Sequence, residues 1–288
     1  MNRRTFVQTL GLAGTSLLPL GAGRAEEKEG RKEFVGVLVD TTRCVGCRSC
    51  EFACAEAHGF PEPDQDERVM EKERTPGVTQ WSVVNRYDTD AGEVFAKRQC
   101  MHCNQPGCAS ACLTKAMLKT EEGPVIWRED KCMGCRFCMI SCPFDIPKFE
   151  YDSPVPKIQK CTLCWERLEA GNIPACAEAC PAEAITFGQR KELIQEGYQR
   201  IATNPGQYVH HIYGEHEVGG TGYLYLAGVP FEQLGFRTDL DPAPYPELSK
   251  DYLYAVPIVL TLWPAFLLAL SNATKQESEY PGGEAEHE

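Results

Sequence analysis

The residues best suited to chemistry in this chain are its 16 cysteines, which fall into four sets of four. One set lies in the stretch CMGCRFCMISCPFD, where Cys132, Cys135, Cys138 and Cys142 are spaced by three, three and four residues and a proline follows the last. Cysteines this close in the chain are too near one another to be four independent core residues. We therefore expect their thiols to bind one shared group. This spacing is typical of bacterial iron–sulfur proteins, in which the fourth cysteine ligates the other cluster of a pair. The run therefore predicts a partner run.

Three further sets are present. The first repeats the same steps, the second lengthens the middle step, and the last opens its middle step into a loop and again ends in Cys-Pro, at Pro181. Their members are Cys44, Cys47, Cys50 and Cys54; Cys100, Cys103, Cys108 and Cys112; and Cys161, Cys164, Cys176 and Cys180. No cysteine of the sequence is left over.

Three kinds of site could use these cysteines. Disulfides suit an exported protein, but cysteines three residues apart do not pair easily with each other, and disulfide scaffolds are shorter and richer in cysteine. Zinc sites use pairs of C-x2-C without a third cysteine three residues later. Each set here offers three close ligands and a distant fourth, which favours a cubane. We therefore expect four 4Fe–4S clusters, with all sixteen cysteines as iron ligands.

Two features inside the sets concern how a cluster would be held. Gly46 and Gly134 precede the second cysteine of their sets, where a missing Cβ lets the backbone close tightly, although ordinary turn glycines explain them equally well. His102 lies between two cysteines, and because the cysteine count is complete we expect it to hydrogen-bond or pack beside a cluster rather than to bind iron. The remaining histidines considered lie outside any ligand spacing and are expected at a surface or interface: His58, His210, His211 and His216.

Charge excludes one class of function. The chain has 29 basic and 41 acidic side chains, and all three basic residues of positions 1–25 lie in a segment without acids, so the remainder carries a net charge of −15. A nucleic-acid binder needs a basic stripe to displace counterions from phosphates. The sequence has no such stripe.

The first 25 residues indicate export. Arg3 and Arg4 form a charged region, residues 7–20 an apolar region, and Gly23-Arg24-Ala25 a small-residue cleavage site. A pair of arginines followed by Thr-Phe is typical of a twin-arginine signal. Because that route carries folded proteins, it suits a chain that must receive its clusters before export, so we expect the protein on the periplasmic face of the inner (cytoplasmic) membrane.

A second apolar segment lies near the other end, at residues 252–271. Its twenty uncharged residues would cover about 30 Å as a helix, which is the thickness of a bilayer core. Pro257 and Pro264 would kink such a helix without excluding it from a membrane. We expect a transmembrane anchor followed by an acidic tail at 272–288, and the alternative is a helix buried in a soluble core.

Between these ends, short strands alternate with the cysteine sets. We expect strands at 34–39, 81–87, 94–97, 125–127 and 185–187, a helix at 190–201 with apolar spacing of Leu193, Ile194, Tyr198 and Ile201, and a return to β-type residues at 211–236. Residues 59–77 are rich in proline and charge and are expected to form a solvated insertion. The repeated order of strand, cysteine run, short helix and strand resembles two bacterial ferredoxin modules.

Four stretches carry a more specific resemblance: QCMHCNQPGCASAC, CMGCRFCMISCPFD, KCTLCWERLEAGNIPACAEACPAEAITFG and YGEHEVGGTGYLYL. Together they resemble the four-cluster ferredoxin-like iron–sulfur subunit of the molybdoenzyme and membrane hydrogenase family. With an export signal and one terminal helix, the resemblance is closest to the HybA-type subunit of periplasmic nickel–iron hydrogenases. Formate dehydrogenase β subunits share the anchor and the YGEHEVGGT-like segment, and the resemblance covers most of residues 34–270.

The resemblance implies a ligand set for each cluster, because in that family the outer sets pair with each other and so do the inner sets. The four sets would be Cys44, Cys47, Cys50 and Cys180; Cys161, Cys164, Cys176 and Cys54; Cys100, Cys103, Cys108 and Cys142; and Cys132, Cys135, Cys138 and Cys112.

The fold class expected is α+β: two bacterial-ferredoxin-like modules, each with a pair of 4Fe–4S sites, with insertions and one C-terminal transmembrane helix. The outer module would comprise residues 34–99 with 143–240, and the inner module residues 100–142.

The expected function is electron transfer without catalysis. The sequence has no nucleophile–base pair, phosphate loop or Rossmann glycine run. The resemblance implies a relay between a periplasmic catalytic subunit, a hydrogenase or else a formate dehydrogenase or other molybdopterin oxidoreductase, and a quinone-reactive integral membrane subunit. An alternative of another class is a membrane-tethered scaffold whose clusters are structural.

Overall fold

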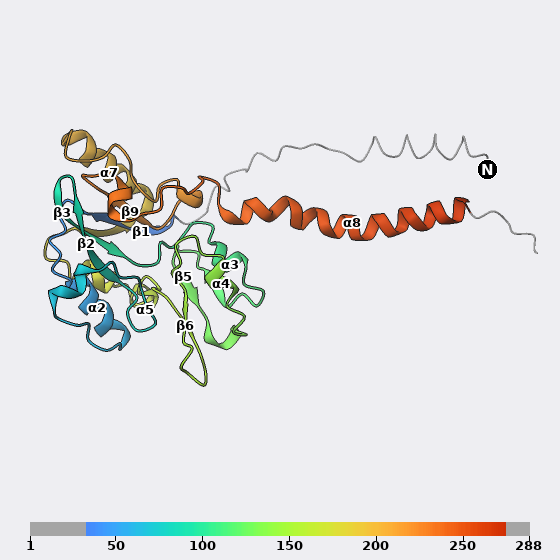
Figure 1. Cartoon of the computed structure of the whole chain (residues 1–288), viewed down its shortest axis with the longest axis horizontal. Helices are drawn as coiled ribbons and strands as arrows, with labels where there is room; N and C mark the ends of the chain where they lie inside the picture. The colour runs from blue at the N-terminus through green and yellow to red at the C-terminus, as the bar shows by residue number, and fades with distance from the viewer. Residues whose placement is uncertain (1–32, 275–288) are drawn as a thin grey trace, which may run out of the picture. The chain divides into compact units, whose positions relative to one another are not determined.

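The computed structural model describes residues 33–274, all within one unit that begins at Glu33. The predicted export signal at 1–25 and the tail from residue 275 lie outside the described residues. The elements of Figure 1 are, in chain order, β1 (Val35–Asp40), α2 (Ser49–His58), η1 (Glu67–Glu71), β2 (Val83–Thr89), β3 (Gly92–Arg98), α3 (Gly107–Ser110), β4 (Met117–Lys119), β5 (Val125–Trp127), η2 (Glu129–Lys131), α4 (Phe137–Ile140), β6 (Lys148–Phe149), β7 (Ile158–Gln159), α5 (Trp165–Glu169), α6 (Ala175–Glu178), β8 (Ile185–Gln189), α7 (Arg190–Thr203), η3 (Glu217–Gly219), β9 (Tyr223–Leu226), η4 (Phe231–Leu234) and α8 (Tyr245–Thr274).

A three-stranded sheet with the order β8-β1-β9 organises the fold; β1 pairs antiparallel with β8 and parallel with β9. Side chains alternate between the two faces of a strand. On one face Leu38, Leu224 and Leu226 join a hydrophobic cluster with α7. On the other face Val37, Val39, Tyr223 and Tyr225 join a cluster that contains cysteines of several sets. The sheet therefore separates a helix from the cysteine-rich half of the protein.

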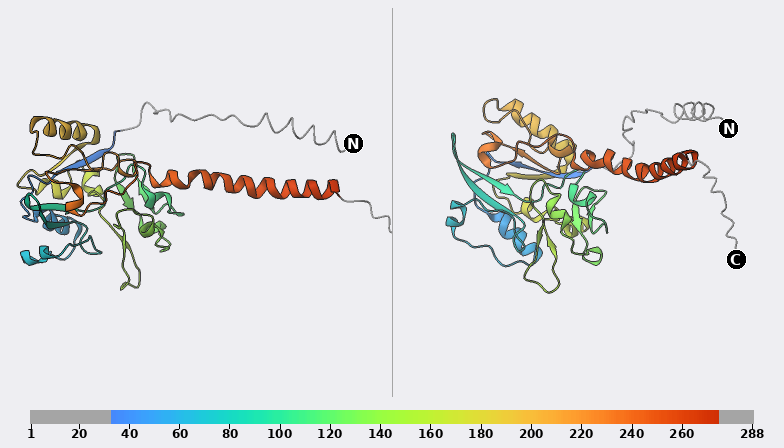
Figure 2. Two further views of the ribbon diagram at one scale, coloured as in Figure 1. Left: turned by 45° about the horizontal axis from the view of Figure 1, so that its top comes forward. Right: turned by 45° about the vertical axis from the view of Figure 1, so that its right-hand side comes forward.

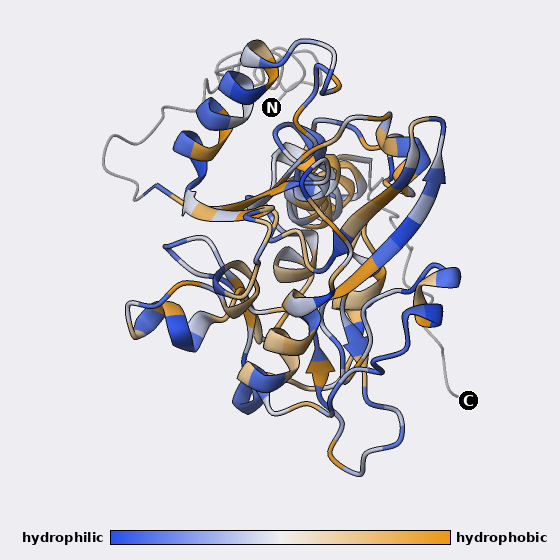
Figure 3. Ribbon diagram, turned by 90° about the vertical axis from the view of Figure 1, so that its left-hand side faces the viewer, coloured by the Kyte–Doolittle hydropathy of each residue, from blue (hydrophilic) through white to orange (hydrophobic). Residues whose placement is uncertain are grey.

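Helix α7 covers one face of this sheet, as the views of Figure 2 show. Its buried residues are Leu193, Gly197 and Ile201, spaced by four, and the rest of the helix is polar, which gives it the mixed colouring of Figure 3. A Cβ on Gly197 would lie 2.8 Å from Cδ1 of Ile212, so the helix approaches the sheet closely here. The predicted helix is confirmed, but Tyr198, expected on its apolar face, is 48% exposed.

The other strands form three hairpins, β2-β3, β4-β5 and β6-β7. All five strands predicted from alternation are present, within two or three residues of the expected ends. Strands β4, β6 and β7 were not predicted. They have two or three residues each and few β-branched or aromatic side chains, unlike the equally short β5, whose residues are Val, Ile and Trp.

The prediction of a solvated insertion at 59–77 is only partly right. Its surface is mostly exposed, but Met70 is 6% exposed and Arg74 reaches into the protein. Both nitrogens of the Arg74 guanidinium head donate to Glu51 of α2, and the Arg74 amide donates to the Asn85 side chain of β2. The segment is thus attached to the first cysteine set through buried charge.

Helix α8 spans 30 residues and continues through Pro257 and Pro264. No residue of it is buried, and it is the one helix among residues 33–274 long and apolar enough to cross a membrane. The alternative that this segment packs inside a soluble core is therefore wrong for the described structure.

Candidate iron–sulfur sites

The turn after the first cysteine has the same backbone form in all four sets. The residue before the second cysteine has a left-handed φ in each: +71° at Gly46, +50° at His102, +72° at Gly134 and +59° at Leu163. Only glycine adopts this region without cost, yet two sets use other residues. The turn is thus imposed by the surroundings, and glycine eases it without being required.

The two glycines differ in their surroundings. A Cβ on Gly46 would lie 2.5 Å from the Phe95 ring, whereas a Cβ on Gly134 would meet no atom within 4 Å. Glycine is therefore needed at position 46 for its missing side chain, whereas at position 134 it only eases the backbone conformation. Equivalent positions in the sequence are not equivalent in packing.

The fourth cysteine of three sets begins a second repeated turn. Three residues after it a residue with a left-handed φ donates its amide to the cysteine carbonyl, at 3.1–3.3 Å. The pairs are Lys115 with Cys112, Asp145 with Cys142 and Glu183 with Cys180. In the remaining set, Cys54 instead lies inside helix α2. The turn forms after Cys112 although Leu113 stands where two other sets have proline, so proline is not needed for it.

Backbone N–H groups are directed at several sulfurs. The Leu163 amide donates to Sγ of Cys161 and the Met117 amide to Sγ of Cys112, each at 3.4 Å. At Cys44, burial raises the thiol pKa to about 11 while the Gly46 amide opposes the rise. Amides aimed at sulfur favour an anionic ligand, as a cluster requires.

The first outer group, defined as the proposed ligands from the first set and the last cysteine of the fourth set, lines one cavity. Cys44, Cys47, Cys50 and Cys180 all border it, together with Lys97. Repulsion from Cys180 and Cys47 adds to the rise in the Cys44 pKa that burial begins. Residues 130 positions apart in the chain thus meet at one place.

The second outer group gathers around Cys54. Burial raises the pKa of its thiol, and repulsion from Cys161, Cys176 and Cys164 adds to the rise. Cys54 therefore lies beside the last set rather than beside the near neighbours of its own run.

The inner sets cross in the same way. Burial raises the pKa of Cys103, and the next largest contributions are repulsion from Cys100, Cys142 and Cys108. Burial likewise raises the pKa of Cys138 to about 11, followed by repulsion from Cys112, Cys132 and Cys135. In each pair of sets, the fourth cysteine of one run thus lies near the first three of the other. The neighbourhoods also overlap, because Cys176 is near Cys50 and Cys100 is near Cys161.

The spacing within each group suits a cluster better than a single ion. All sixteen cysteines are free thiols. Among residues 33–274, no three cysteine, histidine or carboxylate side chains converge tightly enough to bind one metal ion. A tetrahedral zinc needs such convergence at about 2.3 Å per sulfur. A cubane instead spreads its four thiolates over four iron atoms, so the residues present fit that group.

Three buried or nearly buried lysines surround these groups, and none was singled out from the sequence. Lys97 and Lys160 are 1% and 2% exposed, and Nζ of Lys160 donates to the Cys161 carbonyl at 2.7 Å. Burial lowers the pKa of Lys119 to about 8, while Cys103 and Cys100 oppose the fall. Lysine side chains are usually exposed, and nothing in the sequence distinguishes these three from the other basic residues, 29 in all. Their burial is therefore evident only from the tertiary structure.

Two histidines lie close to the cysteines. Nδ1 of His102 accepts the Val125 amide at 2.9 Å, which agrees with the predicted hydrogen-bonding role. Its Nε2 is buried and has no hydrogen-bond partner among the described residues. His58, expected at a surface or interface, is half-buried: its Nε2 is 3.5 Å from Sγ of Cys164 and its ring packs on Trp81. His210 and His216 are exposed, and His211 bonds to Glu217 at 2.7 Å.

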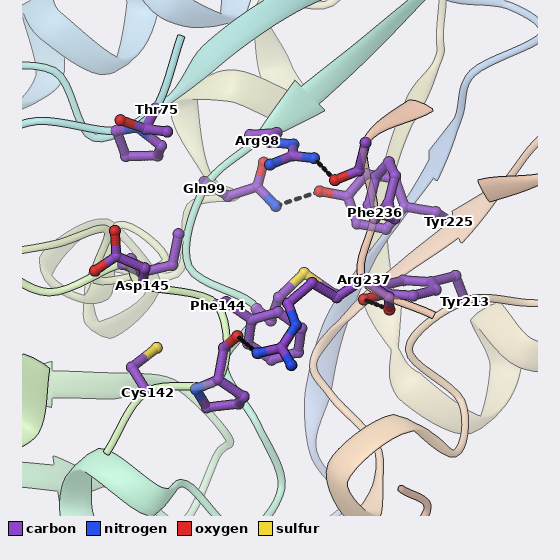
Figure 4. A pocket seen from close by; sticks show the side chains of 15 residues that line it. Thr75, Arg98, Gln99, Cys142, Phe144, Asp145, Tyr213, Tyr225, Phe236 and Arg237 are labelled. Carbon is purple, nitrogen blue, oxygen red and sulfur yellow. Dashed lines mark hydrogen bonds between the residues drawn. The ribbon is translucent and has the colours of Figure 1, made fainter. Parts of the chain in front are cut away.

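A separate pocket of about 350 Å³ borders the inner group at Cys142 (Figure 4). Aromatic rings of Phe144, Tyr213, Tyr225 and Phe236 line it. Its Gln99 side chain donates to the Tyr225 hydroxyl at 2.6 Å. The guanidinium of Arg237 is already held by Asp239 and by the Pro143 carbonyl. The polar groups of the wall are thus largely satisfied by the protein.

Comparisons with known proteins identify the family of the chain. Residues 92–190 match the family described as a 4Fe-4S dicluster domain. The chain is 44% identical over 290 residues to a protein of Nitratidesulfovibrio vulgaris, covering 97% of this chain and 78% of the relative. It is 34% identical to the hydrogenase-2 operon protein HybA of Escherichia coli O157:H7 over the full length of both.

A third relative is the nitrate-inducible formate dehydrogenase iron–sulfur subunit of Escherichia coli K12, 32% identical over 68% of each chain. The chain belongs to the family of ferredoxin-like iron–sulfur subunits that includes HybA and the iron–sulfur subunits of formate dehydrogenases.

Proposed function

We propose that the protein carries four 4Fe–4S clusters and relays electrons from a periplasmic hydrogenase to a quinone-reactive membrane subunit. The observation that supports this most directly is that, in each pair of sets, the fourth cysteine of one run lies near the first three of the other. The ligand groups would be those predicted from the sequence, including Cys180 in the group of Cys44 and Cys142 in the group of Cys100. A 4Fe–4S cluster, when bound, supplies one-electron exchange without rearrangement of bonds.

The cysteines also suggest two ends for the relay. Cys47 and Cys135 are exposed, while the other fourteen are buried or half-buried. One belongs to the first outer group and the other to an inner group. Electron exchange with a partner needs a short path at the surface, and these two positions offer one each.

The inner end lies beside the proposed anchor. Tyr245 at the start of α8 lines a groove with residues of α3 and α4, which carry cysteines of the inner groups. Apolar side chains near those cysteines are exposed, at 87% for Leu113 and 81% for Ile140. Such residues suit contact with a membrane or an apolar partner. This arrangement supports electron exit at the inner groups, beside α8 as the anchor. The periplasmic side of the membrane is proposed from the twin-arginine pattern of residues 1–25.

A hydrogenase is the preferred partner because the full length of the chain aligns with HybA. A formate dehydrogenase is the second candidate, because the iron–sulfur subunit of one aligns over two thirds of the chain. In either case the chain would be a non-catalytic subunit, and the clusters would move between two charge states rather than serve as structural supports.

Serine substitutions test the ligand groups. In the full-length chain purified without oxygen, Cys142→Ser is expected to perturb the same spectroscopic signal as Cys100→Ser and to leave the signal perturbed by Cys138→Ser intact. If Cys142→Ser instead matched Cys138→Ser, the crossed grouping would be wrong. Reduction of the wild-type clusters in the isolated complex on addition of hydrogen then tests the relay; clusters that stay oxidised would favour a scaffold.

A further inference from the structure

Lys97 is a buried charge without a buried acid to match it. Its side chain is 1% exposed on strand β3. Its ammonium donates to Oε1 of Gln99 at 2.8 Å, and no carboxylate among residues 33–274 forms an ion pair with it. Burying an unpaired ammonium costs several kcal/mol, so such a group is retained where it faces negative charge.

The negative charge it faces comes from both outer cysteine groups. Lys97 borders the cavity lined by Cys44, Cys47, Cys50 and Cys180. Its ammonium lies 5.3 Å from the centre of the Tyr223 ring, and the hydroxyl of that tyrosine is 3.7 Å from Sγ of Cys176 in the second group. Lys97 is thus located between the two groups.

A closed ring of hydrogen bonds fixes the ammonium in this place. Gln99 accepts from Lys97 and donates to the Tyr225 hydroxyl at 2.6 Å, and that hydroxyl donates to the Lys97 carbonyl at 2.9 Å. Gln99 and Tyr225 are 2% and 1% exposed. Every bond of the ring is buried, so the charge cannot swing away into water.

We infer that Lys97 is a fixed counter-charge shared by the two outer clusters, which raises their reduction potentials, and that Gln99 and Tyr225 position it. A cluster with its four thiolates becomes more negative on reduction, so a nearby cation stabilises the reduced form. The inner groups have a buried lysine of their own, Lys160, which is 2% exposed and donates to the Val125 carbonyl in the hydrophobic cluster of Cys108 and Cys138. Their potentials should therefore stay unchanged when Lys97 is substituted. This inference rests on the proposed assignment of clusters to the cysteine groups.

The test is a potentiometric titration, followed by EPR, of the full-length chain carrying its clusters. Lys97→Met should lower the reduced-to-oxidised ratio of at least one outer cluster about ten-fold at fixed ambient potential, which is a shift of about 59 mV for one electron. Lys97→Arg keeps the charge and should recover most of the shift. The matched control is Lys191→Met, which removes one charge from a side chain 75% exposed and should shift nothing.

Gln99→Glu gives a second readout if Lys97→Met fails to assemble its clusters. It keeps the size of the side chain and places a carboxylate beside the ammonium, while losing the bond that Gln99 donates to the Tyr225 hydroxyl, so it should lower the same potentials. If the clusters of the wild-type protein titrate and those of Lys97→Met or Gln99→Glu have the same potentials, the role of Lys97 is overturned. The proposed function would be unaffected by that result. Wild-type protein without reducible clusters would instead overturn the proposed function.

Discussion

At the scale of single residues, the geometry of the site depends on backbone conformation as much as on the cysteines. The left-handed residue before the second cysteine recurs in all four sets, with glycine in two of them. His102 and Leu163 show that other residues pay the conformational cost, which is about 1–2 kcal/mol for an L-residue. The two glycine positions therefore differ in the space available for a side chain and not in backbone conformation.

This difference predicts unequal effects of the same substitution. Gly46→Ala should reduce cluster content and stability strongly, because its Cβ would overlap the Phe95 ring at 2.5 Å. Gly134→Ala should cost only about 1 kcal/mol, because its Cβ meets no neighbour within 4 Å. Iron per chain and thermal unfolding midpoints would measure both. Equal losses for the two variants, or no rescue of Gly46→Ala by Phe95→Ala, would show that the ring is not the cause.

Much of the site at this scale could be predicted from sequence. Cysteine spacing identifies the ligands because a cubane demands three close thiols. The burial of Lys97, the position of His58 beside Cys164 and the steric need for Gly46 could not be predicted, since each depends on residues distant in the chain. Strand β2, by contrast, is visible from its alternation of residues 81–87.

At the scale of elements, buried Glu51 joins α2, the 59–77 segment and β2. Its carboxylate is 0% exposed and accepts hydrogen bonds from Arg48, Arg74, Gln80 and the Val84 amide. Helix α2 carries Cys50 and Cys54, one for each outer group. A single carboxylate thus holds the helix that supplies ligands to two proposed clusters.

Glu51→Ala is expected to destabilise the fold by about 3–5 kcal/mol, because it leaves two guanidinium groups facing a buried site without their counter-charge. Glu51→Gln keeps the shape and should cost less. The matched control is Glu67→Ala, in the exposed part of the 59–77 segment, whose free energy of unfolding should be close to that of the wild type. Chemical denaturation of the oxygen-free protein measures the three; an Ala variant as stable as the control would contradict the role given to Glu51.

At the scale of the whole molecule, the proposed anchor, α8, and the region that carries the cysteines are separable. No residue of α8 is buried, and its contacts with α3 and α4 are made by its first ten residues. Loss of the apolar part should therefore release the protein from membranes without loss of clusters.

A truncation after Lys250 tests this, because it removes the apolar segment and keeps four of the six groove residues that α8 supplies, losing only Leu253 and Tyr254. The truncated protein should appear in the carbonate-soluble fraction with its iron content unchanged. A chain ending at Thr274 removes only the acidic tail and should stay with the membrane. Membrane retention of the Lys250 truncation would show that α8 is not the anchor.

The number of clusters is the central claim for the whole molecule. The matched dicluster region begins at residue 92 and so excludes the first set, Cys44 to Cys54. The fold brings that set back to Cys161, Cys176 and Cys180, which is why four sites are proposed instead of two.

Iron analysis with Mössbauer spectroscopy of the full-length, anaerobically prepared chain tests this most directly. The proposed assignment predicts about 16 irons per chain, all in 4Fe–4S clusters that accept electrons on reduction. About eight irons, or zinc in place of iron, would contradict it.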